Sequence, residues 1–260
     1  MQLSDILYEK YRALAQRFGS KFDGIGRFGG TVADIPESER HQSTMHEAFY
    51  GNTGAVVHKW RHYLPIYDRH LGRYRDTPVR LLEIGVFQGG SLRMWRKYLG
   101  DHAKLFGIDI DPKCAAFNGE AGYVRIGSQD DPAFLHKVLE EMGGVDVVID
   151  DGSHIAEHQR MTFDTLFPLL DAHGIYICED THTAYWRGYG GGYRRSSNFI
   201  EIAKRIADDL HADFHSRPQG VRNASRCISG LHFYNSMVVI EKEPQERPTH
   251  LMVSNPQDAS

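Results

Sequence analysis

Two acidic segments of the sequence carry residues that can bind a metal ion and remove a proton. Asp150 and Asp151 precede His154, and Glu179 and Asp180 form a second acidic pair further along the chain. Carboxylates held close together cost free energy unless a cation neutralises them. Oxygen ligands suit a hard ion such as Mg²⁺, and a histidine beside that ion can act as a general base. The simpler alternative is a set of solvated turn carboxylates without a metal.

A glycine-rich segment and an acidic residue after it indicate a nucleoside-binding site. The segment EIGVFQGGS, residues 83–91, leads from an apolar run into a helical pattern, and its glycines let a ligand approach the backbone. Asp109 lies nineteen residues after Gly90, where a carboxylate can accept both hydroxyls of a ribose. Ser128 and Gln129 follow the next apolar run, where an adenine would lie. A dinucleotide enzyme is the alternative, although its pyrophosphate would need a tighter glycine pattern.

The elements that must position these residues follow from the alternation of apolar runs and helical patterns. Buried strands are expected at 79–85, 104–110, 123–128, 145–151 and 174–180, with helices at 90–99, 112–118, 131–142 and 155–170. Residues 230–242 predict two more strands with a turn at Asn235-Ser236. The pattern predicts an α/β, Rossmann-like fold with a mostly parallel seven-stranded sheet and an antiparallel C-terminal edge. Ligands bind beyond the carboxyl ends of such strands, so the acidic strand ends should meet at one rim.

The flanking segments are expected to add little to this single domain. Residues 1–54 predict an N-terminal helix, over 1–18, and a flexible connector, whereas 55–243 form the domain and 244–260 a loose tail. Within the domain, 58–74 mixes basic and aromatic residues and serves either plain packing or ligand contact. The aromatic, arginine- and glycine-rich segment 185–195 is interpreted as an acceptor lid, or else as a surface loop without a special role.

Composition excludes several classes of protein. Hydrophobic residues make up 41% and charged residues 25% of 260 residues, which is ordinary for a globular protein with a full core. The formal net charge of −4 disfavours nucleic acid as a partner. The sequence has no signal-peptide pattern and no apolar stretch long enough to span a membrane. Its three cysteines are far apart, so we expect a cytoplasmic protein.

Five motifs carry a resemblance to a known family. LLEIGVFQGGS, FGIDIDP, GSQDDP, VVIDDGSH and EDTHTAYW resemble the metal-dependent, S-adenosylmethionine (SAM)-dependent O-methyltransferases that act on sugars of macrolides and related natural products, together with mycobacterial polysaccharide methyltransferases and the cephalosporin hydroxylase-like group. The resemblance covers about residues 55–242. A more distant similarity to catechol O-methyltransferase supports the same placement. The chain lacks a large N-terminal domain before residue 55, which leaves the oligomeric state and the acceptor open.

The resemblance implies a role for each matched residue. Asp151, Glu179 and Asp180 would bind Mg²⁺, and His154 would remove the proton of a sugar hydroxyl as its oxygen attacks the methyl group of SAM. The residues implied to bind SAM are Glu83, Gly85 and Ser91 at the methionine end, Asp109 at the ribose, Ser128 and Gln129 at the adenine, and Asp150, which would shape the cofactor side of its strand end. The expected acceptor is a sugar-containing small molecule or oligosaccharide, and a homo-oligomer is possible.

Three other interpretations stay open. His154-Ile-Ala-Glu157-His158 fits the HxxEH pattern of inverted zinc peptidases, although His154 follows a strand rather than lying within a helix. His211 and Asp213 imitate part of the iron site of a hydroxylase, although they lie away from the acidic rim. A non-catalytic SAM-binding module would keep the fold, but it would have no need for a metal and base set.

Overall fold

A computed structural model describes residues 29–216 and 224–253. The helix expected over residues 1–18 lies outside the described residues, as do residues 19–28 of the expected connector and the last part of the expected tail, 254–260. Within the described part, no helix is both long and apolar enough to cross a membrane.

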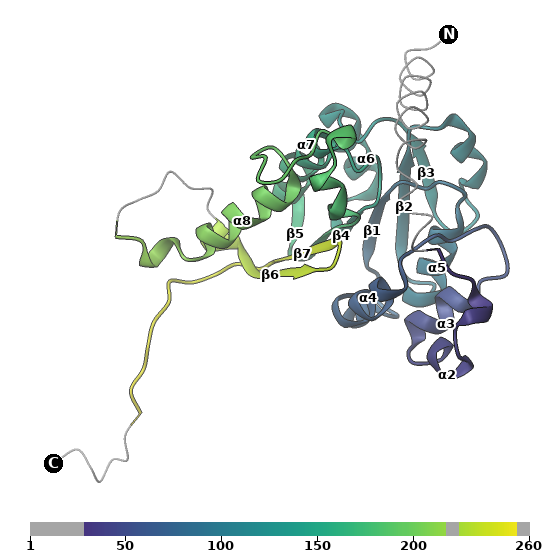
Figure 1. Cartoon of the computed structure of the whole chain (residues 1–260), viewed down its shortest axis with the longest axis horizontal. Helices are drawn as coiled ribbons and strands as arrows, with labels where there is room; N and C mark the ends of the chain where they lie inside the picture. The colour runs from purple at the N-terminus through teal and green to yellow at the C-terminus, as the bar shows by residue number, and fades with distance from the viewer. Residues whose placement is uncertain (1–28, 217–223, 254–260) are drawn as a thin grey trace.

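The core is a seven-stranded sheet with the order β3-β2-β1-β4-β5-β7-β6 (Figure 1). Its strands are β1 (Arg80–Ile84), β2 (Lys104–Asp109), β3 (Tyr123–Ile126), β4 (Val145–Asp150), β5 (Leu170–Cys178), β6 (Ile228–Tyr234) and β7 (Met237–Lys242). The first five run parallel, and β7 pairs antiparallel with β5 and β6. The predicted mostly parallel sheet with an antiparallel C-terminal edge is therefore confirmed.

Helices cover both faces of this sheet (Figure 1). The α-helices are α2 (Glu37–Arg40), α3 (Thr44–Tyr50), α4 (Leu64–Leu71), α5 (Gly90–Leu99), α6 (Pro132–Met142), α7 (Ala156–Leu166), α8 (Phe199–Leu210) and α9 (Ala224–Cys227). Short 3-10 turns are η2 (Val32–Asp34), η3 (Arg61–Tyr63), η4 (Gly72–Tyr74), η5 (Pro112–Phe117), η6 (Phe167–Leu169), η7 (Thr181–Tyr185), η8 (Arg187–Tyr189) and η9 (Ala212–Phe214). Buried side chains of α6, α7 and α8 form one apolar layer, and those of α3, α4 and α5 form the other.

Two predicted helices differ from the observed elements. Residues 112–117 form only the 3-10 turn η5, which starts at Pro112 after Asp111 caps it by accepting from the Lys113 amide. The helix expected over 155–170 ends at Leu166, because Pro168 lacks the N–H that would continue it. Strand β5 then begins at Leu170, earlier than the predicted start at 174.

The segment before residue 55 contributes to the core. Met45 and Ala48 of α3 are buried against α4 and α5. Two short helices therefore occupy part of a segment that the sequence placed outside the domain. At the other end, residues 244–253 have no helix or strand and run away from the sheet (Figure 1).

Gly85 follows β1 directly and lies against the backbone just after β4, so we expect a side chain there to be strongly unfavourable. Its φ is +96°, and a Cβ would lie 2.2 Å from the carbonyl oxygen of Asp151. Gly119 has a similar φ of +88° but open space around it, so Gly119→Ala measures backbone strain alone, about 1–2 kcal/mol. Gly85→Ala should lose about a further 1–3 kcal/mol because backbone atoms must move. Urea denaturation of both variants checks this, and equal losses would contradict it.

Candidate active site

A cavity of about 420 Å³ opens beyond the carboxyl ends of the parallel strands. Ile84, Asp109 and Asp151 lie at or just after the ends of β1, β2 and β4, and all three line it. Glu179 and Asp180, directly after β5, complete the rim. The acidic strand ends predicted from sequence therefore converge on one cavity, as expected for an open parallel sheet.

Three side chains at this rim face one another closely enough to share a cation. Asp151, His154 and Asp180 each offer a ligand atom within 4.8 Å of the others. The Nε2 atom of His154 lies 3.5 Å from Oδ2 of Asp180 and 3.9 Å from Oδ1 of Asp151. His154 and Asp180 both hold positive φ values, 56° and 50°. Such strain persists only where the surrounding structure enforces it, and it is typical of functional sites.

The carboxylate of Glu179 lies deeper and is already bonded to other side chains. It accepts hydrogen bonds from Lys59 Nζ at 3.0 Å and from Tyr67 Oη at 2.5 Å. Its side chain is only 1% exposed, compared with 21% for Asp151 and Asp180. A carboxylate has about four acceptor positions, so these two donors leave room for a further ligand.

Lys59 places a buried ammonium group among three carboxyl groups. Its Nζ lies 2.6 Å from Asp151, 3.0 Å from Glu179 and 3.6 Å from Glu83, with the side chain 2% exposed. Burial alone would lower the pKa of Lys59, but the three negative charges outweigh it and raise that pKa above its usual value. One ammonium cannot balance three carboxylates. Burial, together with this excess of negative charge, accordingly raises the pKa of Glu179 and of Glu83.

The carboxylate of Asp180 accepts hydrogen bonds from two aromatic side chains. Its Oδ1 accepts from Trp60 Nε1 at 2.9 Å and from Tyr63 Oη at 2.8 Å. Burial would raise the pKa of Asp180, but the neighbouring His154 and the Tyr63 hydrogen bond outweigh burial and lower it. Asp180 therefore stays ionised, with Oδ2 turned toward His154.

The three residues expected at the methionine end of the cofactor, together with Asp150 on the cofactor side, divide into those that line the cavity and those behind it. Gly85 and Ser91 line the cavity. Glu83 is fully buried and does not line it; its carboxylate accepts from Ser91 Oγ at 2.6 Å and from Trp95 Nε1 at 3.0 Å. Asp150 is also fully buried behind the cavity, where burial raises its pKa to about 6.

The residues expected at the ribose and adenine line the cavity but also support its loops. Asp109 accepts from the backbone amides of Val86 and Phe87, both at 2.9 Å, and so holds the glycine-rich loop. Ser128 donates its hydroxyl hydrogen bond to Asp130.

Both the oxygen and the nitrogen of the Gln129 side-chain amide form hydrogen bonds within the protein. Its Oε1 accepts from the backbone amide of Ser153 at 2.7 Å, and its Nε2 donates to Asp150 at 3.1 Å and to Thr162 Oγ1 at 3.0 Å. These bonds tie the loop after β3 to the loop after β4. The sequence predicted an adenine contact for Gln129, and the structure adds this loop-joining role.

We expect Gln129→Leu to destabilise the fold by about 1–3 kcal/mol, because the substitution leaves the buried Ser153 amide without its acceptor. Urea denaturation measures the loss. Ser128→Ala, which removes an exposed hydroxyl of the same loop, is the matched control and should change stability by less than about 0.5 kcal/mol. Similar losses in both variants would show that Gln129 has no special role.

Four residues of the site come from the segment 58–74, which includes α4. The sequence left the role of this segment open between packing and ligand contact. Lys59, Tyr63 and Tyr67 are spaced by four residues, and each bonds a rim carboxylate, as does Trp60. That four-residue spacing of polar groups was the available signal. By contrast, none of residues 185–195 lines the cavity.

The geometry does not favour the two alternative metal motifs. His154 lies before α7, whereas His158 lies within it and bonds Ser153 Oγ through Nδ1, so the two histidines do not share a helix face. Asp213 is ion-paired with Arg226 at 2.6 Å, and His211 is the C-cap of α8; neither residue lines the cavity.

Comparison with known proteins identifies a domain match and several relatives of this chain. Residues 82–181 match the model of a methyltransferase domain. The chain is 40% identical over 195 residues to the 8-demethyl-8-(2-methoxy-alpha-L-rhamnosyl)-tetracenomycin-C 3'-O-methyltransferase of Streptomyces olivaceus, covering 70% of this chain and 50% of that protein. It is 41% identical over 189 residues to the L-olivosyl-oleandolide 3-O-methyltransferase of Streptomyces antibioticus, covering 65% and 47%. The chain thus spans about half the length of the curated relatives it matches.

A solved structure agrees with these relatives. The methyltransferase MycE from the mycinamycin biosynthetic pathway, in complex with Mg, SAH and mycinamycin VI, superposes with a TM-score of 0.69 at 33% identity. The superposition covers 78% of this chain and 54% of MycE. With its class I fold and its acidic rim, the chain carries a methyltransferase domain, and the proteins that it is similar to include sugar O-methyltransferases of macrolide and tetracenomycin glycosides.

Proposed function

We propose that this protein is a SAM- and Mg²⁺-dependent O-methyltransferase that methylates a sugar hydroxyl of a glycosylated natural product. The observation that carries the proposal is the continuity of the site: one cavity runs from the glycine-rich loop after β1 to the group formed by Asp151, His154 and Asp180. A methyl donor and a metal-bound hydroxyl can therefore meet in one space. Holding two reactants in this way can contribute about 7–11 kcal/mol to lowering the barrier.

The cavity residues fit a sulfonium nucleoside. Gly85 and Ser91 would contact its methionine end and Asp109 its ribose, while Ser128 and Gln129 would lie beside the adenine. Glu83 and Asp150 would act from behind, Glu83 by fixing Ser91 and Asp150 by fixing Gln129.

The rim residues fit a magnesium ion. We assign Asp151, Glu179 and Asp180 as its ligands, because their oxygens suit Mg²⁺ and because the rim carries more negative charge than Lys59 balances. When bound, the ion would polarise the acceptor hydroxyl and lower its pKa. The pairing of Lys59 with Asp151 and Glu179 holds both carboxylates in place at the rim.

We assign His154 as the base that removes the proton of the sugar hydroxyl. Its Nε2 faces the two outer rim carboxylates, and its side chain is 21% exposed to the cavity mouth. The relatives named above methylate sugars of glycosides, which supports an acceptor of that class.

The experiment is a calorimetric titration of the full chain with SAM and then with Mg²⁺, followed by methyl transfer to a panel of rhamnosyl and olivosyl polyketide glycosides. We expect SAM binding, a separate Mg²⁺ signal, and transfer that chelation by EDTA abolishes. Failure to bind SAM would overturn the assignment. SAM binding with transfer that is indifferent to EDTA would overturn the metal part alone.

A further inference from the structure

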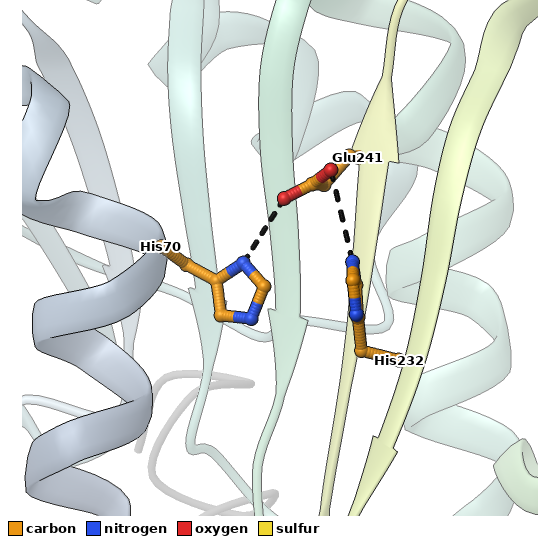
Figure 2. A group of neighbouring side chains, drawn as sticks. All are labelled: His70, His232 and Glu241. Atoms are coloured by element: carbon orange, nitrogen blue, oxygen red, sulfur yellow. Dashed lines mark hydrogen bonds and ion pairs between the residues drawn. The ribbon is translucent and has the colours of Figure 1, made fainter.

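A second group of potential metal ligands lies away from the candidate active site, between α4 and the antiparallel edge of the sheet (Figure 2). His70 comes from α4, His232 from β6 and Glu241 from β7. Each offers one ligand atom, and these atoms lie within 4.8 Å of one another. Figure 2 shows both imidazole rings directed at the carboxylate of Glu241, one toward each oxygen.

The two oxygens of Glu241 contact the two histidines unequally. Nδ1 of His70 lies 3.0 Å from Oε1, a hydrogen bond, whereas Nε2 of His232 lies 3.7 Å from Oε2, too far for one. That Nε2 atom is buried and has no hydrogen-bond partner among the described residues. A buried ring nitrogen without a partner costs free energy, and a bound cation would remove that cost.

Gly230 leaves space open at the point where these atoms converge. A Cβ on this residue would lie 2.9 Å from Oε2 of Glu241 and 3.0 Å from Nε2 of His232. The pairing of β6 with β7 shifts register between Ile228 and Gly230, a bulge of the kind that redirects side chains. Glycine at this position therefore keeps a side chain out of the space between two of the three ligand atoms.

The surroundings of His70 are also those of a metal ligand. Its second ring nitrogen, Nε2, is 2.8 Å from the hydroxyl of Tyr234, which fixes the ring with Nδ1 directed at Glu241. Metal-binding histidines usually bond a second partner in this way.

We propose that His70, His232 and Glu241 form a zinc-binding site that fastens α4 to the β6–β7 edge of the sheet. Two imidazoles and one carboxylate are a donor set typical of Zn²⁺, with water completing four ligands, whereas Mg²⁺ prefers oxygen alone. His232 and Glu241 are 33% and 29% exposed, so an ion can enter from solvent.

The site is separate from the methyl-transfer rim but shares a helix with it. Glu241 pairs with Ile175, four residues before Glu179, which places it about 13 Å back along β5. On α4, His70 lies three residues after Tyr67, whose hydroxyl bonds Glu179. A zinc ion at this place would hold α4, and with it Tyr67, against the sheet.

The test is a zinc titration of the full chain without an affinity tag, in saturating Mg²⁺ so that the rim is occupied by its own ion. We expect His232→Ala to weaken one zinc site by more than about 100-fold, since loss of a partner outside the ligands already costs 10–100-fold. Tyr234→Phe, which removes the hydroxyl that bonds His70, should weaken zinc binding by about 10–100-fold. His173→Ala is the matched control, because His173 is also a histidine beside a glutamate, Glu243, but is 70% exposed.

Two further measurements keep the test decisive. Gly230→Ala retains all three ligands yet fills the space between them, so it should weaken zinc binding as a ligand variant does. Co²⁺, used in place of zinc, should give a tetrahedral visible spectrum that His232→Ala abolishes and His173→Ala does not. Zinc affinity equal in wild type and His232→Ala would overturn the proposal. So would a zinc site lost in Asp151→Asn but kept in His232→Ala, because the ion would then lie at the rim.

Discussion

Asp151→Asn is expected to abolish methyl transfer while leaving SAM binding intact. The substitution removes a negative charge from the proposed magnesium site but keeps the shape of the side chain. Asp151 lines the cavity beside both Lys59 and His154, at 2.6 and 3.9 Å, so it serves the ion and the base together. A positioned base alone supplies about 10²–10⁴-fold in rate, which sets the loss expected for His154→Ala. The loss for Asp151→Asn should exceed about 10⁴-fold, because it removes the metal as well as the arrangement around the base.

Initial rates with saturating SAM, with and without added Mg²⁺, measure this difference. Thermal unfolding of each variant separates lost chemistry from lost folding. Glu157→Gln makes the same acid-to-amide type of change at a side chain that is 76% exposed, and it should retain the wild-type rate. If Asp151→Asn were no slower than His154→Ala, Asp151 could not be a metal ligand.

Lys59→Met is expected to cost about 3–5 kcal/mol of folding stability, the usual penalty for removing one partner of a buried charge group. The variant would leave Glu83, Asp151 and Glu179 without their nearest cation. Added Mg²⁺ should therefore stabilise Lys59→Met more than it stabilises the wild type, because the metal would replace part of the lost charge. Urea denaturation with and without Mg²⁺ measures both effects.

The loss in Lys59→Met should also grow as the pH rises. Burial raises the pKa of Glu83 above its ordinary value of 4.5, and Lys59 opposes that rise. In the variant the pKa of Glu83 in the folded protein is higher still. Protonated Glu83 therefore makes its full contribution to folding stability below pH 4.5, and that contribution is lost as the pH rises through the pKa of the folded protein. The deficit should accordingly be larger at pH 8 than at pH 5. Lys97→Met removes an exposed lysine whose ammonium bonds the Glu47 carbonyl, and it should cost less than about 1 kcal/mol at either pH. A loss for Lys59→Met that matched this control would contradict the role of Lys59.

The agreement between sequence and structure is best where local pattern decides the outcome. The apolar runs that end in Asp109, Asp150 and Glu179 are short and bounded by turns, which is typical of buried parallel strands. Right-handed crossovers then bring the carboxyl ends of neighbouring strands to the same edge. The convergence of Asp151 and Asp180 with His154 follows from these two rules, and no knowledge of side-chain packing is needed.

Element ends were predicted less well, because they depend on single residues. Pro168 stops α7 and starts the turn into β5, and residues 112–117 form a 3-10 turn after the Asp111 cap. A periodic pattern of apolar residues carries little information about either event, since neither changes the spacing of the buried side chains.

The sequence by itself determined the fold class, the order of the motifs and the chemistry of the rim. Only the tertiary structure decided which residues balance the charge of that rim. Lys59 lies 92 residues before Asp151 and 120 before Glu179, yet its ammonium bonds both. The same packing places Glu83 and Asp150 behind the cavity and joins His70 to Glu241 across 171 residues. Such contacts depend on how α4 docks against the sheet, and that docking is set by burial of the whole apolar face of the helix rather than by any local motif.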